Sequence, residues 1–378
     1  MRIALDARTL APADSGMGSY TLNLVRALLA ADPDLELVLI CWTPPTQADL
    51  QDPRITVVRF PFHPMLPATQ WVLPAWLRPH AFDLFHAPFE VVPSGLRHPL
   101  VVTVHDLHWL VNPCYNSTNP LRRLVEGTYY RVSVRRAMRQ AWRLLAVSHA
   151  TRQAILEYAP WYAGKTRVTY HGIDTQRMYP LAPDRAWGQL AHLLPPGTPF
   201  VLTVGQGTPY KNHVNAVRGF LAAFGGHPQY RLVLVRRFVR HDTTLDALLR
   251  TPQARAQVLC LPYVPPDVLN ALYNAARIVL HPSYHEGFGL PLLEAMQVGT
   301  PIVTSGVSAM PEIVGSAALL VNPADVGAMA DALVRLDQDA AVRARCIAEG
   351  RKRLDLFRWS HCARATLEVY REVADSVR

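Results

Sequence analysis

Two glutamates flank a glycine-rich run, with Glu294 eight positions after Glu286 and Gly287-Phe288-Gly289-Leu290-Pro291 between them. Glycines let backbone N–H groups approach a ligand closely, and a helix that starts after them adds a partial positive charge. Such a pocket favours an anion, most simply a phosphate. A carboxylate beside a phosphate site accepts hydrogen bonds from the vicinal hydroxyls of a ribose or a sugar ring. Two carboxylates on either side of one anion site therefore indicate a nucleotide sugar.

The neighbouring segments predict the elements that position this run. Residues 276–280 form an apolar stretch typical of a short buried strand. Pro291 suits the first position of a helix, because its missing N–H would have no partner there. Apolar residues within 292–298 give the helix a buried face, and Gly299 followed by Pro301 ends it. The predicted order is strand, glycine loop, helix.

A second loop of this kind contains a lysine. Residues 200–205 read as a strand that ends at Gly205, and residues 206–212 form a loop before a helix that starts at His213. Lys211 lies in this loop and is one of only three lysines in the chain. We expect its ammonium to neutralise a bound diphosphate.

A third glycine loop follows the N-terminal strand, residues 2–6. Residues 11–20 contain Gly16 and Gly18 and precede an amphipathic helix. A short Gly-x-Gly segment is by itself typical of a plain turn, so its functional interpretation depends on the site in the second half of the chain. Farther on, His105 ends the strand 100–106, and ligands of parallel sheets bind beyond the carboxyl ends of strands.

The run Glu-Gly-Phe-Gly-Leu-Pro, followed by Glu-Ala-Met and Gly-Thr-Pro-Ile-Val, resembles the signature of the retaining, nucleotide-sugar-dependent glycosyltransferases of family 4. The resemblance covers residues 261–323. It implies the α/β GT-B fold, in which two Rossmann-like, doubly wound parallel-sheet domains face a central cleft. The expected domains are 1–180, which binds the acceptor, and 181–357, which binds the nucleotide sugar. Residues 358–378 are expected to form a helix that packs back on the first domain.

The resemblance also implies roles for individual residues. Glu294 holds the ribose, Glu286 the hexose hydroxyls, and His105 contacts the donor sugar. The turn 263–267 with Val264 contacts the base. The residues expected to bind the donor are Gly16, Gly18, Gly205, Lys211, Arg236, Val264, Glu286, Gly287, Phe288, Gly289, Leu290 and Glu294, and the expected catalytic residues are His105, Lys211 and Glu286.

The chain departs from the family pattern at two positions. Many members have arginine directly after the glycine of the strand or just before the lysine, whereas this chain has Gln206 and Tyr210. We expect Arg236 or Arg237, at the end of the next strand, to reach the diphosphate instead. The departures also leave open a sugar-nucleotide binder without catalysis.

Composition limits the alternatives. Half of the 378 residues are apolar and 18% are charged, which favours large cores. The five cysteines form no Cys-x-x-Cys pair and indicate reduced thiols in the cytoplasm. Neither a signal peptide nor an apolar run of about 18 residues is present, so we expect a cytoplasmic protein. No Asp-x-Asp motif or metal-ligand spacing occurs, so no metal and no cofactor besides the nucleotide-sugar co-substrate is expected.

The net charge of +9 points to an acidic partner. Seven arginines lie between Arg122 and Arg143, opposed only by Glu126, and they favour either a solvated helix face or a peripheral contact with anionic lipid. Residues 61–79, rich in proline and aromatics, fit either a packed subdomain or an exposed apolar surface. A nucleic-acid partner is not expected, because few stacking aromatics accompany the arginines.

These observations favour a retaining, metal-independent transferase. It would move a mannose- or glucose-type hexose from a nucleotide diphosphate sugar to a glycan or lipid-linked acceptor in surface polysaccharide or glycoconjugate synthesis. The two loops favour GDP-mannose slightly as the donor, followed by UDP-hexose. The alternative is a GT-B protein that epimerises the donor or only binds it.

Overall fold

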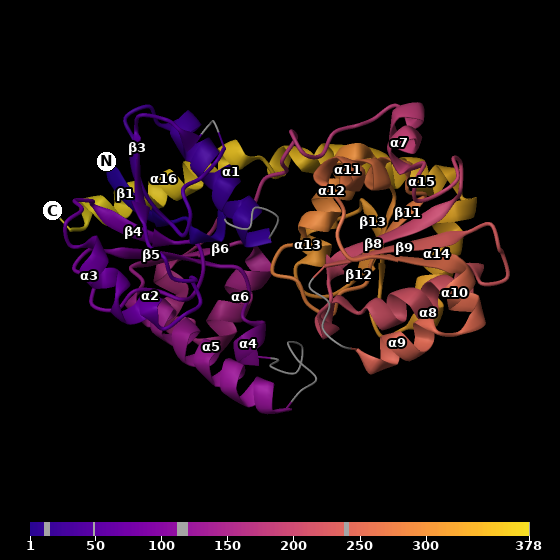
Figure 1. Ribbon diagram of the computed structural model, residues 1–378, viewed down its shortest axis with the longest axis horizontal. Coiled ribbons are helices and arrows are strands. Elements are labelled where there is room, and N and C mark those ends of the chain that lie inside the picture. Colours follow the sequence, from indigo (N-terminus) through magenta and orange to yellow (C-terminus); the bar gives the residue numbers. More distant parts are fainter. Residues whose placement is uncertain (11–15, 48–49, 112–119, 238–241, 378) are drawn as a thin grey trace. The chain divides into compact units, whose positions relative to one another are not determined.

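The computed structural model describes residues 1–10, 16–47, 50–111, 120–237 and 242–377. The chain divides into two compact units. The first unit comprises the described residues within Met1–Val111, Leu124–Gly172 and Phe357–Arg378, and the second comprises those within Asn112–Arg123 and Ile173–Leu356. Each unit is built on one parallel sheet with helices on its faces (Figure 1).

The first unit has a seven-stranded sheet in the order β3-β2-β1-β4-β5-β6-β7, with every neighbouring pair parallel. Its strands are β1 (Arg2–Asp6), β2 (Glu36–Cys41), β3 (Ile55–Arg59), β4 (Leu84–Ala87), β5 (Leu100–Val104), β6 (Arg143–Ala146) and β7 (Thr166–Val168). Successive side chains of a strand point to opposite faces. Ile3 and Leu5 accordingly belong to one buried cluster and Ala4 to another, so both faces of the sheet are covered.

The helices of the first unit include the C-terminal helix. They are η1 (Arg8–Leu10), α1 (Gly16–Ala31), α2 (Ala68–Trp71), α3 (Leu73–Leu77), α4 (His108–Val111), α5 (Pro120–Gln140), α6 (His149–Tyr158), η4 (Pro160–Lys165) and α16 (Trp359–Asp375). Helix α16, yellow in Figure 1, runs beside α1 and β4, and its Leu367 and Tyr370 share a buried cluster with Ile3. The last segment of the chain is therefore part of the first hydrophobic core.

The second unit has a six-stranded parallel sheet in the order β10-β9-β8-β11-β12-β13. Its strands are β8 (Phe200–Gln206), β9 (Arg231–Arg237), β10 (Val258–Leu261), β11 (Ile278–His281), β12 (Ile302–Ser305) and β13 (Ala318–Val321). Its helices are α7 (Pro183–Leu190), η5 (Pro209–Lys211), α8 (His213–Phe224), α9 (Thr243–Leu249), α10 (Pro252–Gln257), α11 (Pro266–Ala275), α12 (Leu290–Val298), α13 (Met310–Val314), α14 (Val326–Gln338), α15 (Ala340–Arg353) and η6 (Leu354–Leu356).

In both sheets the strand order reverses at one point, between β1 and β4 in the first and between β8 and β11 in the second. Open parallel sheets bind ligands outside the carboxyl ends of the strands at such a switch point. The loop with Lys211 follows β8, and the loop with Glu286 follows β11. The doubly wound parallel architecture expected from the sequence is confirmed, and it places the two loops at neighbouring strand ends.

Two local expectations are corrected. Gly16 and Gly18 were expected in a loop, but they form the first turn of α1. Thr21 Oγ1 donates to the carbonyl of Met17 at 2.9 Å, a contact between residues one helical turn apart. Residues 11–15 of the expected loop lie outside the described residues. The second correction is small: α12 begins at Leu290, with Gly289 as its N-cap and Pro291 inside the first turn.

Residues 61–79, for which the sequence left two interpretations open, contain both a packed and an exposed part. Leu73 and Leu77 are buried, whereas Trp71 and Trp76 are largely exposed. Along the described part of the chain, we find no helix with both the length and the apolarity needed to cross a bilayer.

Candidate functional site

Lys211 and Glu286 meet at the switch point of the second unit. The strands that precede them, β8 and β11, are paired through Val201–Ile278 and Leu202–Val279. The Lys211 ammonium lies 2.6 Å from Oε1 of Glu286, although 75 positions separate them. The two side chains expose only 11% and 10% of their surface. The two charged groups that the sequence assigned to one ligand are thus in direct contact.

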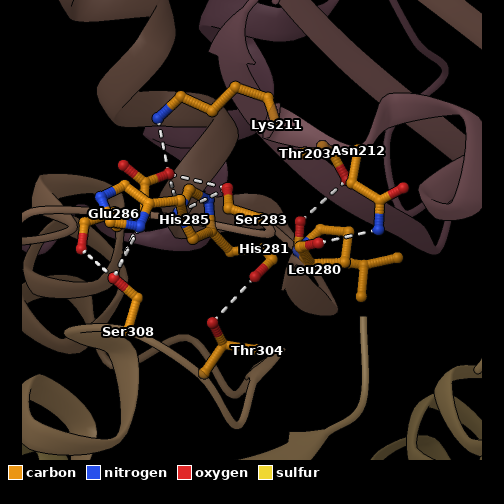
Figure 2. Close-up of polar contacts among 11 residues, drawn as sticks. Thr203, Lys211, Asn212, Leu280, His281, Ser283, His285, Glu286, Thr304 and Ser308 are labelled. Carbon is orange, nitrogen blue, oxygen red and sulfur yellow. Dashed lines mark hydrogen bonds and ion pairs between the residues drawn. The ribbon is translucent and has the colours of Figure 1, made fainter. Parts of the chain in front are cut away.

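The three hydrogen bonds to the Glu286 carboxylate all go to one of its two oxygens, Oε1. Oε1 accepts from Lys211 Nζ at 2.6 Å, from Ser283 Oγ at 2.7 Å and from His281 Nε2 at 2.9 Å. Among the described residues, no donor is bonded to Oε2, and Figure 2 shows the three contacts converging on a single oxygen. The carboxylate is therefore fixed through one oxygen and leaves the other as a hydrogen-bond acceptor.

The charge state of Glu286 follows from these contacts. Burial by itself would raise the pKa of Glu286, but the Lys211 ammonium and the His281 ring hold the pKa of this carboxyl well below its usual range. Glu286 is therefore ionised at neutral pH. Since an ionised carboxylate only accepts hydrogen bonds, Oε2 can receive a hydroxyl donor but cannot supply a proton.

Ser308 supports the backbone of the Glu286 loop. Its hydroxyl donates to the carbonyl of Glu286 at 2.6 Å and accepts from the Glu286 N–H at 3.3 Å (Figure 2). Ser308 has a φ of 56°, a left-handed conformation that is uncommon outside glycine. Sequence reasoning missed this residue, because it lies 22 positions downstream in the loop between β12 and α13 and belongs to no recognised motif.

Asn212 holds the Lys211 loop in a similar way. Its backbone is also left-handed, with a φ of 58°, which asparagine tolerates better than most residues. The side-chain amide is buried and donates to the carbonyls of Pro282, at 2.9 Å, and Pro323, at 2.7 Å. Asn212 thereby joins the end of η5 to the loops that follow β11 and β13. The loop 206–212 that contains Asn212 was predicted from the sequence, but this positioning role was not.

The glycine run forms the N-terminus of α12. Gly289 has a φ of 105°, and a Cβ atom there would lie 3.0 Å from Cδ1 of Leu292, so both conformation and space favour glycine. No side chain caps the helix. The first N–H groups of a helix lack partners within it and carry its partial positive charge. Phe288 is buried and Leu290 is half-buried. The N-terminus of α12 thus has no side-chain cap, and the anion-binding role of Gly287, Phe288 and Gly289 stays a prediction.

Glu294 lies one turn into α12 and is half-buried. Burial raises the pKa of its carboxyl, while the nearby Tyr273 hydroxyl and the Arg177 guanidinium act in the opposite direction. This is an environment different from that of Glu286, whose pKa is lowered. The ribose contact of Glu294 stays a prediction.

The remaining residues of the second unit that are predicted to bind the donor lie at or after neighbouring strand ends. Gly205 of β8 pairs with Arg236 of β9, whose side chain is buried. Val264 is buried before α11. The side chain of Arg237 lies outside the described part of the structure. Lys211 Nζ lies 5.2 Å from the ring centroid of Tyr210, so the tyrosine found in place of arginine contacts the ammonium through its π face.

His105 belongs to the first unit, as do Gly16 and Gly18. It follows β5, and its Nε2 lies 2.8 Å from the carbonyl of Pro88. Burial lowers the pKa of His105, so the ring is neutral, Nε2 carries the hydrogen, and Nδ1 is left as an acceptor. The ring meets Tyr20 of α1 edge-on at 4.9 Å.

Two acids lie near His105: Asp106, its neighbour in the sequence, and Glu90, for which the sequence predicted no role. Glu90 Oε1 accepts the N–H of His105 at 3.1 Å, and Asp106 forms an ion pair with His108. Burial, together with the charge of Asp106, raises the pKa of Glu90 to about 7. Glu90, His105, Asp106 and His108 thus lie beyond the carboxyl ends of β4 and β5. Across the described residues, no set of three or more His, Cys, Asp or Glu side chains is arranged to hold a metal ion.

Two doubly wound parallel-sheet units, each with one point at which the strand order reverses, have the architecture of the GT-B fold. A family profile described as Glycosyl transferases group 1 matches residues 190–353, and one described as Glycosyltransferase Family 4 matches residues 15–177. The chain is 30% identical over 303 residues to the O-antigen chain mannosyltransferase B of Escherichia coli, a match that covers 79% of this chain and 76% of the relative. The chain belongs to glycosyltransferase family 4.

Other relatives agree with this assignment. The alpha-maltose-1-phosphate synthase of Mycolicibacterium smegmatis is 31% identical over 304 residues, which is 73% of each chain. Among solved structures, the sucrose-phosphate synthase of Thermosynechococcus elongatus has a TM-score of 0.77 at 23% identity, and all of both chains is covered. The Anabaena protein HepE in complex with UDP and glucose has a TM-score of 0.71 at 20% identity over 100% of this chain and 98% of its own. These structures share the GT-B fold.

Proposed function

We propose that this glycosyltransferase moves a hexose, with retention of anomeric configuration, from a nucleoside diphosphate sugar to a glycan or lipid-linked acceptor. The observation that carries the proposal is the Glu286 carboxylate, which is anchored through Oε1 and presents Oε2 beside Lys211. Oε2 accepts hexose hydroxyls, and the diphosphate lies on Lys211 and the first N–H groups of α12.

Charge development favours this arrangement. When the anomeric carbon–oxygen bond breaks, the diphosphate gains negative charge, and donors already aimed at it stabilise the transition state by about 3 kcal/mol each. The Lys211 side chain and the N-terminus of α12 supply positive charge to the site, so the proposal requires no metal ion. A covalent role for Glu286 is disfavoured, because its low pKa makes it a weak nucleophile and Oε1 is already bonded three times. Attack from the face of the leaving phosphate, which takes the acceptor proton, accounts for retention.

The donor we favour is GDP-mannose, followed by UDP-glucose. The name of the Escherichia coli relative, an O-antigen chain mannosyltransferase, supports a mannose donor and an acceptor in surface polysaccharide. The UDP and glucose bound to HepE support the second choice. His105 remains the expected contact of the donor sugar, and Glu90 and Asp106 beside it supply polar groups for an acceptor rich in hydroxyls.

Binding and turnover test this proposal separately. A ligand at 100 times its dissociation constant stabilises a protein by about 2.7 kcal/mol, so a thermal-shift panel of nucleotide sugars identifies the donor. With the donor known, release of nucleoside diphosphate in the presence of oligosaccharide or lipid-linked acceptors, and the anomeric coupling of the product by NMR, test transfer and retention. An epimerised donor without acceptor indicates the epimerase alternative, and binding without release of diphosphate indicates a non-catalytic binder.

We further propose that the protein attaches to the inner face of an anionic membrane, where lipid-linked acceptors lie. Trp71 is 68% exposed and Trp76 44% exposed, and the Arg136 guanidinium of α5 lies 5.1 Å from the ring centroid of Trp71. Interfacial aromatics next to basic residues are typical of peripheral attachment. The side chains of Arg122 and Arg123, included in the predicted basic surface, lie outside the described residues.

Vesicle co-sedimentation tests the membrane contact. We expect binding to vesicles that contain phosphatidylglycerol and much less to pure phosphatidylcholine, with salt weakening it. Replacing Trp71 and Trp76 by serine should release the protein. Trp161→Ser is the matched control, because Trp161 is 76% exposed in the same unit but lies in η4. Equal binding by the double variant and the control would remove the membrane part of the proposal and leave the transferase part intact.

A further inference from the structure

His213 is the first residue of α8 and follows Lys211 and Asn212 directly. Its side chain is only 4% exposed. Three groups act on it electrostatically, each from a different element: Arg236 of β9, Lys211 of η5 and His281 of β11. Lys211 and His281 are both bonded to Glu286, the acid of this group. A buried imidazole thus lies within a positive cluster at the switch point.

Nε2 of His213 faces the end of β8. A Cβ atom placed on Gly205 would lie 3.2 Å from this nitrogen and 3.3 Å from Cδ of Lys211. The nitrogen is buried, and among the described residues no group forms a hydrogen bond with it. A buried polar atom without a partner costs about 1–3 kcal/mol, so its place in the Lys211 site calls for a physical reason.

Burial, reinforced by the charges of Arg236 and Lys211, lowers the pKa of His213 to about 3. The ring is therefore neutral at physiological pH when Lys211 is paired with Glu286. A diphosphate that binds to Lys211 reverses the sign of this environment, because it adds negative charge where positive charge now dominates.

We propose that His213 is part of the diphosphate-binding site, and that it takes up one proton from solvent when the diphosphate of the donor binds. The inference rests on the proposed function. Protonation gives Nε2 a hydrogen to donate to a phosphate oxygen, and the imidazolium joins Lys211 and Arg236 in holding the anion. No bond to His213 forms during transfer. The electron pair of the anomeric carbon–oxygen bond remains on the diphosphate, next to this added charge.

Calorimetry measures the proton directly. Each phosphate of a nucleotide sugar carries one ester and one anhydride bond and has no ionisation near neutral pH, so a proton taken up at about pH 6 must go to the protein. Titration of the preferred nucleotide sugar into the full chain, in two buffers of different protonation enthalpy, should show uptake approaching one proton. Affinity should accordingly fall as pH rises, by up to tenfold per pH unit while uptake is complete.

His213→Gln separates a proton from a hydrogen bond, because glutamine keeps an N–H donor but cannot be protonated in this range. We expect this variant to bind the donor at least tenfold more weakly at about pH 6 and to take up no proton. His192→Gln, at an exposed position of the same unit, should behave as the unaltered protein. The ring resonances of His213 in the unaltered protein provide a second measurement, and they should shift to those of imidazolium only with donor bound.

The outcomes are distinguishable. If the unaltered protein binds no nucleotide sugar, the proposed function itself fails. If it binds a nucleotide sugar without taking up a proton, or if His213→Gln takes up as many protons as the unaltered protein, the function stands and the role of His213 is refuted. A neutral His213 signal in the donor complex would refute it as well, whatever the stability of the variant.

Discussion

The Arg8 guanidinium and the Asp6 carboxylate form a two-pronged ion pair with no exposed side-chain surface, Nε to Oδ1 at 2.8 Å and Nη2 to Oδ2 at 2.5 Å. Arg8 Nη1 also donates to the carbonyl of Phe62 and to Thr69 Oγ1. One buried arginine therefore joins the carboxyl end of β1 to the segment that leads into α2. This connection stabilises the part of the first unit that carries Trp71 and Trp76.

Asp6→Asn should destabilise the protein by about 3–5 kcal/mol, because it leaves the Arg8 charge buried without its counter-ion. Chemical denaturation measures the change. Asp52→Asn is the matched control, since Asp52 and Arg54 have the same spacing and the same two-pronged geometry at a partly exposed place. A much smaller loss of stability is expected for Asp52→Asn. Equal losses of stability in the two variants would mean that burial does not determine how much the Asp6–Arg8 pair stabilises the protein.

Glu286→Gln should lower kcat/KM for the donor by about 10²–10³-fold, because it removes an ionised acceptor from the hexose and frees Lys211 from its pair. Affinity for free nucleoside diphosphate, which lacks the hexose, should not weaken. The control is Glu349→Gln in the same unit, which breaks a pair with the exposed Lys352 at 2.7 Å. A fall in nucleoside diphosphate affinity equal to the fall in kcat/KM would place Glu286 on the diphosphate instead.

Ser308→Ala and Ser308→Gly test how the Glu286 loop is held. Both variants lose the hydroxyl that bonds to the Glu286 backbone, so both should lose activity to a similar extent. Glycine accepts the left-handed backbone at position 308 without strain, whereas alanine does not, and the glycine variant should be the more stable by about 1 kcal/mol. Activity that follows stability, with glycine more active than alanine, would show that the backbone conformation matters and the hydroxyl does not.

Glu90→Gln should make stability less dependent on pH. The folded pKa of Glu90 is about 7 and its ordinary value is 4.5, so the folded state holds this proton more tightly than the unfolded state. The resulting stabilisation is complete below pH 4.5 and is lost as pH rises to about 7, at most about 3 kcal/mol in total. Glutamine mimics the protonated carboxyl, so the variant should gain stability relative to the unaltered protein between these values.

Denaturation curves across pH 4–8 measure this effect. Glu157→Gln, on an exposed position of α6 in the same unit, should leave the pH dependence unchanged. Parallel curves for Glu90→Gln and the unaltered protein would show that Glu90 titrates normally. The acidic groups around His105 would then be ordinary carboxylates at neutral pH.

Local signals in the sequence determined the elements next to the site. Gly289, Pro291 and Gly299 predicted α12 to within a residue, because caps and breakers act over one turn of helix. The apolar run before His281 likewise predicted β11, since a strand buried on both faces reads as continuous hydrophobic sequence. The run Glu-Gly-Phe-Gly-Leu-Pro followed by Glu-Ala-Met indicated the family, which the relatives confirm.

Only the tertiary structure decided which of these residues meet. The order of β8 and β11 in the sheet brings Lys211 to Glu286 across 75 positions, and no local pattern encodes strand order. Ser308 and Asn212 act through backbone carbonyls and N–H groups of distant loops, so their residue types carry no motif. His213 reads as an ordinary first residue of a helix. The groups that act on it electrostatically come from three separate elements, because burial and charge depend on packing and not on spacing along the chain.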